Sequence, residues 1–160
     1  NLMLTPMIVP VVITGVALYA SFAKVGLNNT ILGLIMAHSL LAIPMVFLTM
    51  SAAFARFDAN LELAAMSMGS TPVGAFFKVT LPGVKNSVVT GALLSFVTSL
   101  DEVVVTIFVS GANTKTLPMM MWENLRATID PTIAVAATFL IILTLGMYVI
   151  KEFIESRSKD

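Results

Sequence analysis

The chain has 160 residues, of which 58% are hydrophobic and only 11% are charged. Soluble domains carry about 25% charged residues, so most of this chain is predicted to lie in lipid or among other membrane helices. Nine basic residues balance nine acidic ones, which argues against nucleic-acid binding, and the lack of cysteine excludes a disulfide framework and a thiolate metal site.

Four apolar stretches are long enough to cross a bilayer, which takes about 20 helical residues. They cover residues 2–22, 31–53, 84–109 and 133–150. Pro6, Pro10 and Pro44 lie in the first two stretches, where we expect kinks, because neighbouring helices can re-satisfy the carbonyls that a proline frees. The predicted fold class is therefore all-α, a polytopic membrane helical bundle in a single transmembrane domain over residues 1–160. Because Asn1 lies inside an apolar stretch, we expect this domain to be a fragment.

Basic residues indicate the orientation of these spans. Residues 23–29 form a short turn, whereas 56–82 and 111–130 form longer loops. The side that would hold loop 56–82 and the C-terminal tail carries six basic residues: Arg56, Lys78, Lys85, Lys151, Arg157 and Lys159. The other side carries three: Lys24, Lys115 and Arg126. The excess predicts that loop 56–82 and the C-terminus are cytoplasmic and that loop 111–130 is on the outer side.

Loop 56–82 is predicted to contain two short helices. Asp58 can cap a helix over residues 59–68, and Gly69 suits the left-handed position that ends it. Thr71 can cap a second helix that has Pro72 at its first position and must stop near Pro82. A helix of about ten residues is marginal alone in water, so the loop needs a surface on which to dock. Either it lies on the lipid headgroups or it docks on a partner, and the sparse basic residues weigh against the headgroups.

This loop resembles the "EAA" loop of ATP-binding-cassette importer permeases, which reads Glu-Ala-Ala, three residues, Gly, nine residues, Ile-x-Leu-Pro. The chain supplies Ala64, Ala65 and Gly69 in register, followed by Leu81-Pro82 at the required distance. Leu63 stands where the motif has glutamate, and Glu62 is one residue early. The resemblance implies the type I importer permease fold, with a cytoplasmic coupling helix that inserts into a cleft on a separate ATPase. The expected ATPase-coupling residues are Glu62, Ala64, Ala65, Gly69, Leu81 and Pro82.

The third predicted span contains two acids, Asp101 and Glu102, within GALLSFVTSLDEVVVTIFVSG. An ionised acid at the bilayer centre costs about 2.5–3.5 kcal/mol, so such residues usually face a cavity or a partner. On one continuous helix, a single polar stripe would contain Gly91, Ser95, Thr98, Ser99, Glu102 and Thr106, with Asp101 a quarter-turn to one side. The stripe is typical of a watery path, where acids favour a cation. The alternative is that these groups join helices as structural glue.

The run SLDEVVVTIFVSG, followed by TLPMMMWENLRATIDPTIA, resembles the spermidine/putrescine branch of these permeases. The resemblance covers essentially all 160 residues and corresponds to the last four of six spans, so two N-terminal spans are expected to be missing. It implies a bacterial inner-membrane permease that carries out no chemistry itself. Its implied partners are cytoplasmic ATP-binding subunits, a second homologous or identical permease and a periplasmic or lipid-anchored solute-binding protein. Within this interpretation Ser95, Thr98, Ser99, Asp101, Glu102 and Thr106 are candidates for the translocation path.

Trp122 and Glu123 are candidates for docking the solute-binding protein, although a lone tryptophan beside a span is more commonly an interfacial anchor. His38 is expected to be a hydrogen-bonded packing residue, and Met119, Met120 and Met121 flexible apolar packing, so neither is counted as a site. No catalytic residue, metal or cofactor is expected.

Two other functions remain as alternatives. A permease of the same fold for ferric iron, sulfate, molybdate or thiamine is the nearer one. An intramembrane aspartyl protease is remote, because Asp101 is the only aspartate inside a predicted span.

Overall fold

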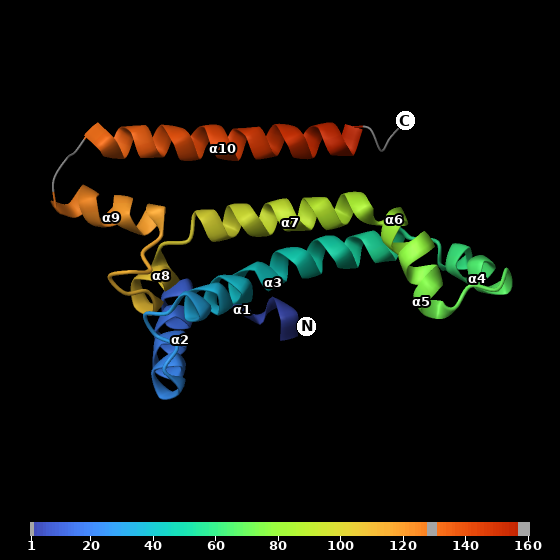
Figure 1. Cartoon of the computed structure of the whole chain (residues 1–160), viewed down its shortest axis with the longest axis horizontal. Coiled ribbons are helices and arrows are strands. Elements are labelled where there is room, and N and C mark those ends of the chain that lie inside the picture. Colours follow the sequence, from blue (N-terminus) through green and yellow to red (C-terminus); the bar gives the residue numbers. More distant parts are fainter. Residues whose placement is uncertain (1, 128–130, 157–160) are drawn as a thin grey trace.

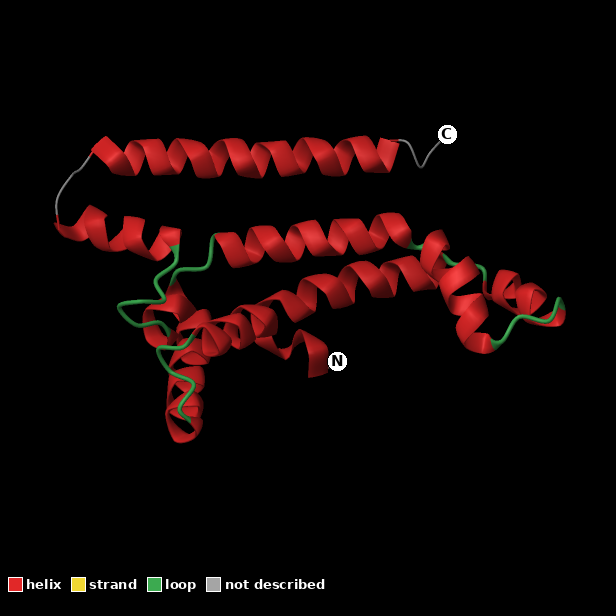
Figure 2. Cartoon of the chain, in the orientation of Figure 1, coloured by secondary structure: helices red, strands yellow, loops and turns green. Residues whose placement is uncertain are grey.

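The computed structural model describes residues 2–127 and 131–156, and these residues form helices and no strand (Figure 2). Position 130 at the end of the outer loop, and the basic residues at positions 157 and 159, therefore lie outside the described residues. In chain order the elements are η1 (Leu2–Leu4), α1 (Thr5–Ile8), α2 (Val11–Val25), α3 (Ile31–Arg56), α4 (Ala59–Ser67), α5 (Pro72–Ala75), η2 (Phe76–Thr80), α6 (Leu81–Gly83), α7 (Lys85–Leu100), α8 (Val104–Val109), α9 (Leu117–Ala127) and α10 (Pro131–Ser156).

Three long helices, α3, α7 and α10, run alongside one another along the length of the molecule (Figure 1). Helix α7 lies in the middle and contacts both of the others, most extensively α3. At one end α2 packs across α8, and at the opposite end α4 and α5 project beyond the long helices. The C-terminal end of α10 lies at the same end as α4 and α5.

Helix α3 forms the predicted second span without interruption. Thr30 caps it, since its Oγ1 accepts a hydrogen bond from the Gly33 amide at 3.0 Å. Pro44 lies in its interior and is buried, yet the helix continues past it to Arg56. Its 26 residues give a length of about 39 Å, more than the hydrocarbon core of a bilayer requires.

The contact between α3 and α7 depends on one small residue. A Cβ atom at Gly91 of α7 would lie 2.6 Å from Thr49 Oγ1 of α3, closer than atoms of these types can approach. The two backbones therefore come together at this point because α7 has no side chain there. Such close approach at small residues is a common way in which membrane helices associate.

The first predicted span is not one helix. Helix α1 and helix α2 meet at an angle of 113° across Val9 and Pro10, so residues 2–22 turn sharply where a kink was expected. Pro10 begins α2 as its cap and has no amide to donate, which ends the hydrogen-bonding ladder of α1 at this place. The predicted turn after α2 is confirmed, with Gly26 at φ +70° ending the helix.

The third predicted span is also divided. Residues 84–109 form α7 and α8, and Asp101, Glu102 and Val103 lie between them outside any helix. Two described helices are long and apolar enough to cross a membrane, Ile31–Arg56 and Ile133–Phe153, or three if the bent first pair counts as one span. The prediction of four spans is therefore not confirmed for the described residues, although the all-helical membrane class is confirmed.

The buried core lies where α2, α3 and α8 meet, and consists of Phe22, Ala37, Val105 and Val109. By contrast, α10 presents apolar side chains outward along its length, with Val135 72% and Ile142 64% exposed. A helix that is apolar on its outer face and long enough to span a bilayer is stable in lipid rather than in water.

Candidate functional site

Loop 56–82 forms a projecting unit, which we call the knob, made of α4, α5, η2 and α6 (residues 58–83). Asp58 caps α4, and its Oδ1 accepts a hydrogen bond from the Asn60 amide at 3.0 Å. Gly69 lies at φ +93° just after α4, and the amides of Gly69 and Ser70 bond back to the carbonyls of Met66 and Ala65. This is the Schellman arrangement, and it confirms the predicted role of Gly69, although the first helix ends at Ser67, one residue earlier than predicted.

The second arm of the knob also begins as predicted. Thr71 Oγ1 accepts a hydrogen bond from the Gly74 amide at 3.1 Å, and Pro72 occupies the first helical position. The arm then continues through a π-helical turn, Phe76–Thr80, in which the Leu81 amide bonds to the Phe76 carbonyl. The wider turn accommodates Pro82, whose ring would clash with a carbonyl four residues back in an α-helix.

Glu62 braces the two arms against each other. Thr80 Oγ1 donates a hydrogen bond to Glu62 Oε2 at 2.9 Å, joining α4 to η2 across 18 residues of sequence. Ala65 and Ala75, which are 6% and 0% exposed, are buried within the knob. Glu62 and Ala65 thus hold the knob together, and of the predicted coupling residues Ala64, Gly69 and Pro82 are the ones exposed.

The exposed apolar side chains of the knob form the surface that is available for a partner. We call these side chains the knob tip: Leu61, Leu63, Met68, Val73 and Phe77, each more than half exposed. Among them is Leu63, which stands where the motif has glutamate. Large apolar side chains that gather outside the spanning helices are typical of an interaction surface.

The predicted polar stripe of the third span is broken into three parts. Ser95, Thr98 and Ser99 lie on α7, the two acids lie in the non-helical break, and Thr106 lies on α8. The prediction of a single continuous polar stripe on one helix is therefore wrong. The break is stabilised locally, because Glu102 Oε1 accepts a hydrogen bond from the Val105 amide at 2.7 Å and so satisfies a free donor at the start of α8.

His38 of α3 joins both sides of this break. Its Nδ1 lies 2.8 Å from Ser99 Oγ, and its Nε2 lies 3.0 Å from Thr106 Oγ1. Thr106 Oγ1 in turn lies 3.1 Å from the Glu102 carbonyl oxygen, to which it donates. His38 is hydrogen-bonded, as predicted, although its partners are 61 and 68 residues away and were not predicted.

Three of the four hydroxyls of the stripe make the contacts between helices that the glue alternative predicts. Ser99 and Thr106 bond to α3 through His38, and Thr98 Oγ1 donates to the Leu94 carbonyl of its own helix at 2.9 Å. Ser95 Oγ lies 3.5 Å from the Ala42 carbonyl of α3, a long contact in the same direction. These contacts occupy polar groups that were also candidates for a watery path.

Asp101 is the acid that faces open space. It is exposed at the C-terminal end of α7, where the helix dipole places partial negative charge, and it lines a cavity of about 380 Å³ between α7 and α10. The other lining residues are Val97, Leu100, Leu140, Ile141, Thr144 and Leu145. A carboxylate above an apolar wall with one hydroxyl favours a ligand that combines positive charge with methylene groups.

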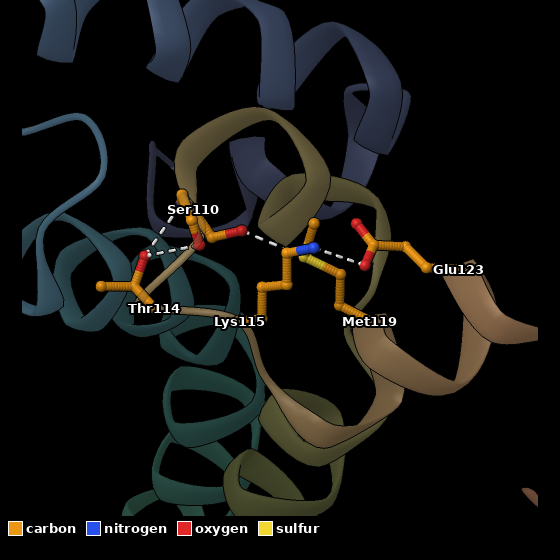
Figure 3. A network of polar contacts seen from close by, with 6 residues as sticks. Ser110, Thr114, Lys115, Met119 and Glu123 are labelled. Carbon is orange, nitrogen blue, oxygen red and sulfur yellow. Dashed lines mark hydrogen bonds and ion pairs between the residues drawn. The ribbon is translucent and has the colours of Figure 1, made fainter.

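The segment between α8 and α9 is held by a network of polar contacts (Figure 3). Lys115 Nζ pairs with Glu123 Oε2 at 2.6 Å, and Ser110 Oγ contacts Met119 Sδ at 3.0 Å. The Gly111 amide donates to Thr114 Oγ1 at 2.8 Å. Met119 is 6% exposed, so its thioether fills space in the protein, as predicted.

Trp122 and Glu123, the two candidates for docking the solute-binding protein, both have partners within this segment. Glu123 is the ion-pair partner of Lys115, and the two side chains are 42% and 33% exposed. Trp122 is 44% exposed, and the Arg126 guanidinium lies 4.8 Å from the centre of its ring. The exposed indole and the neighbouring charges suit either an interfacial anchor or a contact with another protein.

Comparison with known proteins gives matches along the whole chain. Residues 1–160 match the family described as binding-protein-dependent transport system inner membrane component. The putrescine transport system permease protein PotI of Escherichia coli K12 is 33% identical over 142 residues, which cover 85% of this chain and 50% of PotI. The spermidine/putrescine transport system permease protein PotC of Haemophilus influenzae is 33% identical over 152 residues, covering 95% of this chain and 59% of PotC.

A third relative is named for a different cargo. The molybdenum transport system permease protein ModB of Mycobacterium bovis is 28% identical over 164 residues, which cover 93% of this chain and 61% of ModB. The chain thus spans between half and about three-fifths of the length of these three relatives.

Proposed function

This chain belongs to the family of binding-protein-dependent transport system inner membrane components, and from this premise we propose that it is part of the permease subunit of an ATP-driven polyamine importer. In this proposal α3, α7 and α10 contribute to the membrane passage. The knob receives the motion of a cytoplasmic ATPase, which is a separate subunit and carries out the hydrolysis of ATP.

The knob is the observation on which the proposal rests. Its two arms are joined by the Glu62–Thr80 hydrogen bond, so a force applied to one arm is carried by both. Its tip residues are apolar and exposed, and they lie at the end of the molecule where α3 ends and α7 begins. A braced projection with an apolar tip supports docking in a protein cleft better than insertion among headgroups, because the knob has few basic residues.

The cargo proposal depends on two relatives and one acid. The permeases with 33% identity are named for putrescine and spermidine, whereas the permease named for molybdenum has 28% identity. A polyamine is a chain of methylenes that carries ammonium groups. The carboxylate of Asp101 beside an apolar cavity suits such a cation, and an oxyanion such as molybdate would be repelled by the same carboxylate.

The proposed assembly contains two ATP-binding subunits, a second permease and an external solute-binding protein, in the bacterial inner membrane. We place the knob in the cytoplasm because the basic residues favour that side. The C-terminal end of α10 then lies in the cytoplasm as well, since it is at the same end of the molecule as the knob. The segment with Trp122 faces outward in this orientation.

The test uses the full-length permease expressed with its neighbouring transport genes. Cells should take up labelled putrescine or spermidine in an ATP-dependent way, and excess molybdate should not compete. Leu63→Asp and Phe77→Asp place a charge on the knob tip and should abolish co-purification of the ATPase while the permease still inserts. The matched control is Asn60→Asp, which adds the same charge in the first turn of α4, where the helix dipole stabilises it. Retained ATPase binding by both tip variants would contradict the docking role.

A further inference from the structure

The break between α7 and α8 is held to α3 by a directed chain of hydrogen bonds. Ser99 is next to the last residue of α7, Thr106 is in the first turn of α8, and His38 contacts both. A break inside a membrane-spanning segment leaves backbone groups without helical partners, and such groups must be satisfied within the protein. Here the Thr106 hydroxyl and the Glu102 carboxylate satisfy a carbonyl and an amide of the break.

One assignment of protons along this chain of bonds satisfies every group in it. The Thr106 hydroxyl proton is donated to the Glu102 carbonyl, so Thr106 Oγ1 can only accept from His38 Nε2. His38 therefore carries its proton on Nε2. In the neutral ring Nδ1 is then an acceptor, and the Ser99 hydroxyl donates to it. In this assignment each group has one role, and the imidazole has one tautomer.

Helix α3 connects this histidine directly to the knob. From His38 to Arg56 there are 18 residues of uninterrupted helix, a distance of about 27 Å. Beyond Arg56 only Phe57 precedes Asp58, the residue that caps α4 of the knob. A tilt or shift of α3 at its knob end therefore displaces His38, and His38 holds both sides of the residues that include Asp101.

We propose that His38 is a positioning residue that fixes the acid-bearing break (residues 101–103) to α3, so that movement of the knob changes the position of Asp101. This inference rests on the proposed importer function, in which the knob is moved by an ATPase. It differs from a purely packing role, because a packing residue stabilises the fold without linking ATP hydrolysis to the position of Asp101.

The first experiment measures cargo imported per ATP hydrolysed by the complete transporter in proteoliposomes. His38→Ala removes both hydrogen bonds and should lower this ratio about tenfold, the effect expected for two membrane hydrogen bonds, while assembly and ATP hydrolysis persist. His38→Gln retains one donor and one acceptor and should restore most of the ratio. The control Ser39→Ala changes the neighbouring, exposed residue of α3 and should leave the ratio unchanged.

Partner variants test the same link if His38→Ala does not assemble. Ser99→Ala and Thr106→Val each remove one end of the chain of bonds and should each lower the ratio. Adding Thr106→Val to Ser99→Ala should cost less than adding it to the wild-type protein, because the bonds act as one unit. Equal losses of uptake, ATP hydrolysis and complex yield in all these variants would overturn the proposal in favour of plain packing.

The second experiment does not depend on the cargo. The 160 residues contain no cysteine, so Asp101→Cys can serve as a single reporter in this part of the chain. Its rate of reaction with a membrane-impermeant maleimide should change severalfold when ATP is bound to the complex, and this change should disappear with His38→Ala. A nucleotide effect that survives His38→Ala overturns the proposal. If the wild-type complex imports no polyamine, yet the Asp101→Cys complex shows the His38-dependent labelling change, the proposed cargo is refuted and this inference stands.

Discussion

The brace between Glu62 and Thr80 allows a quantitative test of the knob. Thr80→Val replaces the hydroxyl with a methyl group of nearly the same size at a position that is 4% exposed, so packing is retained while the donor is lost. A hydrogen bond to a charged group contributes about 1.5–3 kcal/mol. Glu62 is only partly buried, and water can replace some of the lost contact, so we expect the low end, about 1.5 kcal/mol. This corresponds to about a tenfold rise in the population of knobs with separated arms.

Hydrogen exchange of the full-length permease in nanodiscs measures this population directly. Backbone amides of α4 and η2 should exchange about tenfold faster in Thr80→Val, while amides of α3 and α7 keep their wild-type rates. The matched control is Ser67→Ala, which removes an exposed hydroxyl that bonds only within α4 and should change little.

A double-mutant cycle isolates the brace from other effects of the two substitutions. Glu62→Gln, Thr80→Val and the double variant should give a coupling energy of about 1 kcal/mol, because either single change weakens the same bond. Additive effects within about 0.5 kcal/mol, or unchanged exchange in Thr80→Val, would show that the arms are not held together by this hydrogen bond.

Three further changes test other parts of the structure. Gly91→Ala places a Cβ 2.6 Å from Thr49 Oγ1, so the α3–α7 contact should lose about 1–3 kcal/mol of stabilisation. The loss should appear as a lower unfolding temperature in detergent, and unchanged stability would contradict the close approach. Asp101→Asn should lower polyamine uptake with assembly intact, and equal uptake by this variant and the wild-type protein would remove Asp101 from the path. Glu102→Ala should instead weaken the start of α8, which should lower the free energy of unfolding by about 1 kcal/mol in a thermal unfolding experiment. Trp122→Ala should weaken binding of the solute-binding protein to the reconstituted complex, and unchanged binding would leave Trp122 as an interfacial anchor.

The knob was largely predictable from sequence because its boundaries depend on local chemistry. Asp58, Gly69 and Thr71 each act on backbone groups within a few residues, so their meaning can be understood without knowing the rest of the fold. The brace was not predictable in the same way. It joins residues 18 apart across a turn whose shape is set by the π-helical Phe76–Thr80 segment.

The divided third span shows where sequence patterns are insufficient. Residues 91–109 are apolar apart from Asp101 and the polar stripe, and they contain no proline or glycine at the break. The break is stabilised by Glu102, which bonds to the start of α8, and by His38 from a helix more than 60 residues away. Helical periodicity assumes one continuous axis, so it placed Ser95 and Thr106 on a common face that the folded chain does not have.

The outward face of α10 has a consequence for how this sequence can vary among relatives. Side chains such as Val135, Ile142 and Val149 are each at least 60% exposed, and wherever they meet fluid acyl chains in a bilayer no fixed shape is imposed on them. Exchanges among leucine, isoleucine, valine and phenylalanine should therefore accumulate freely there while the hydropathy stays constant. Along the contact between α3 and α7, where one added methyl at position 91 already collides with a neighbour, evolution has far fewer alternatives.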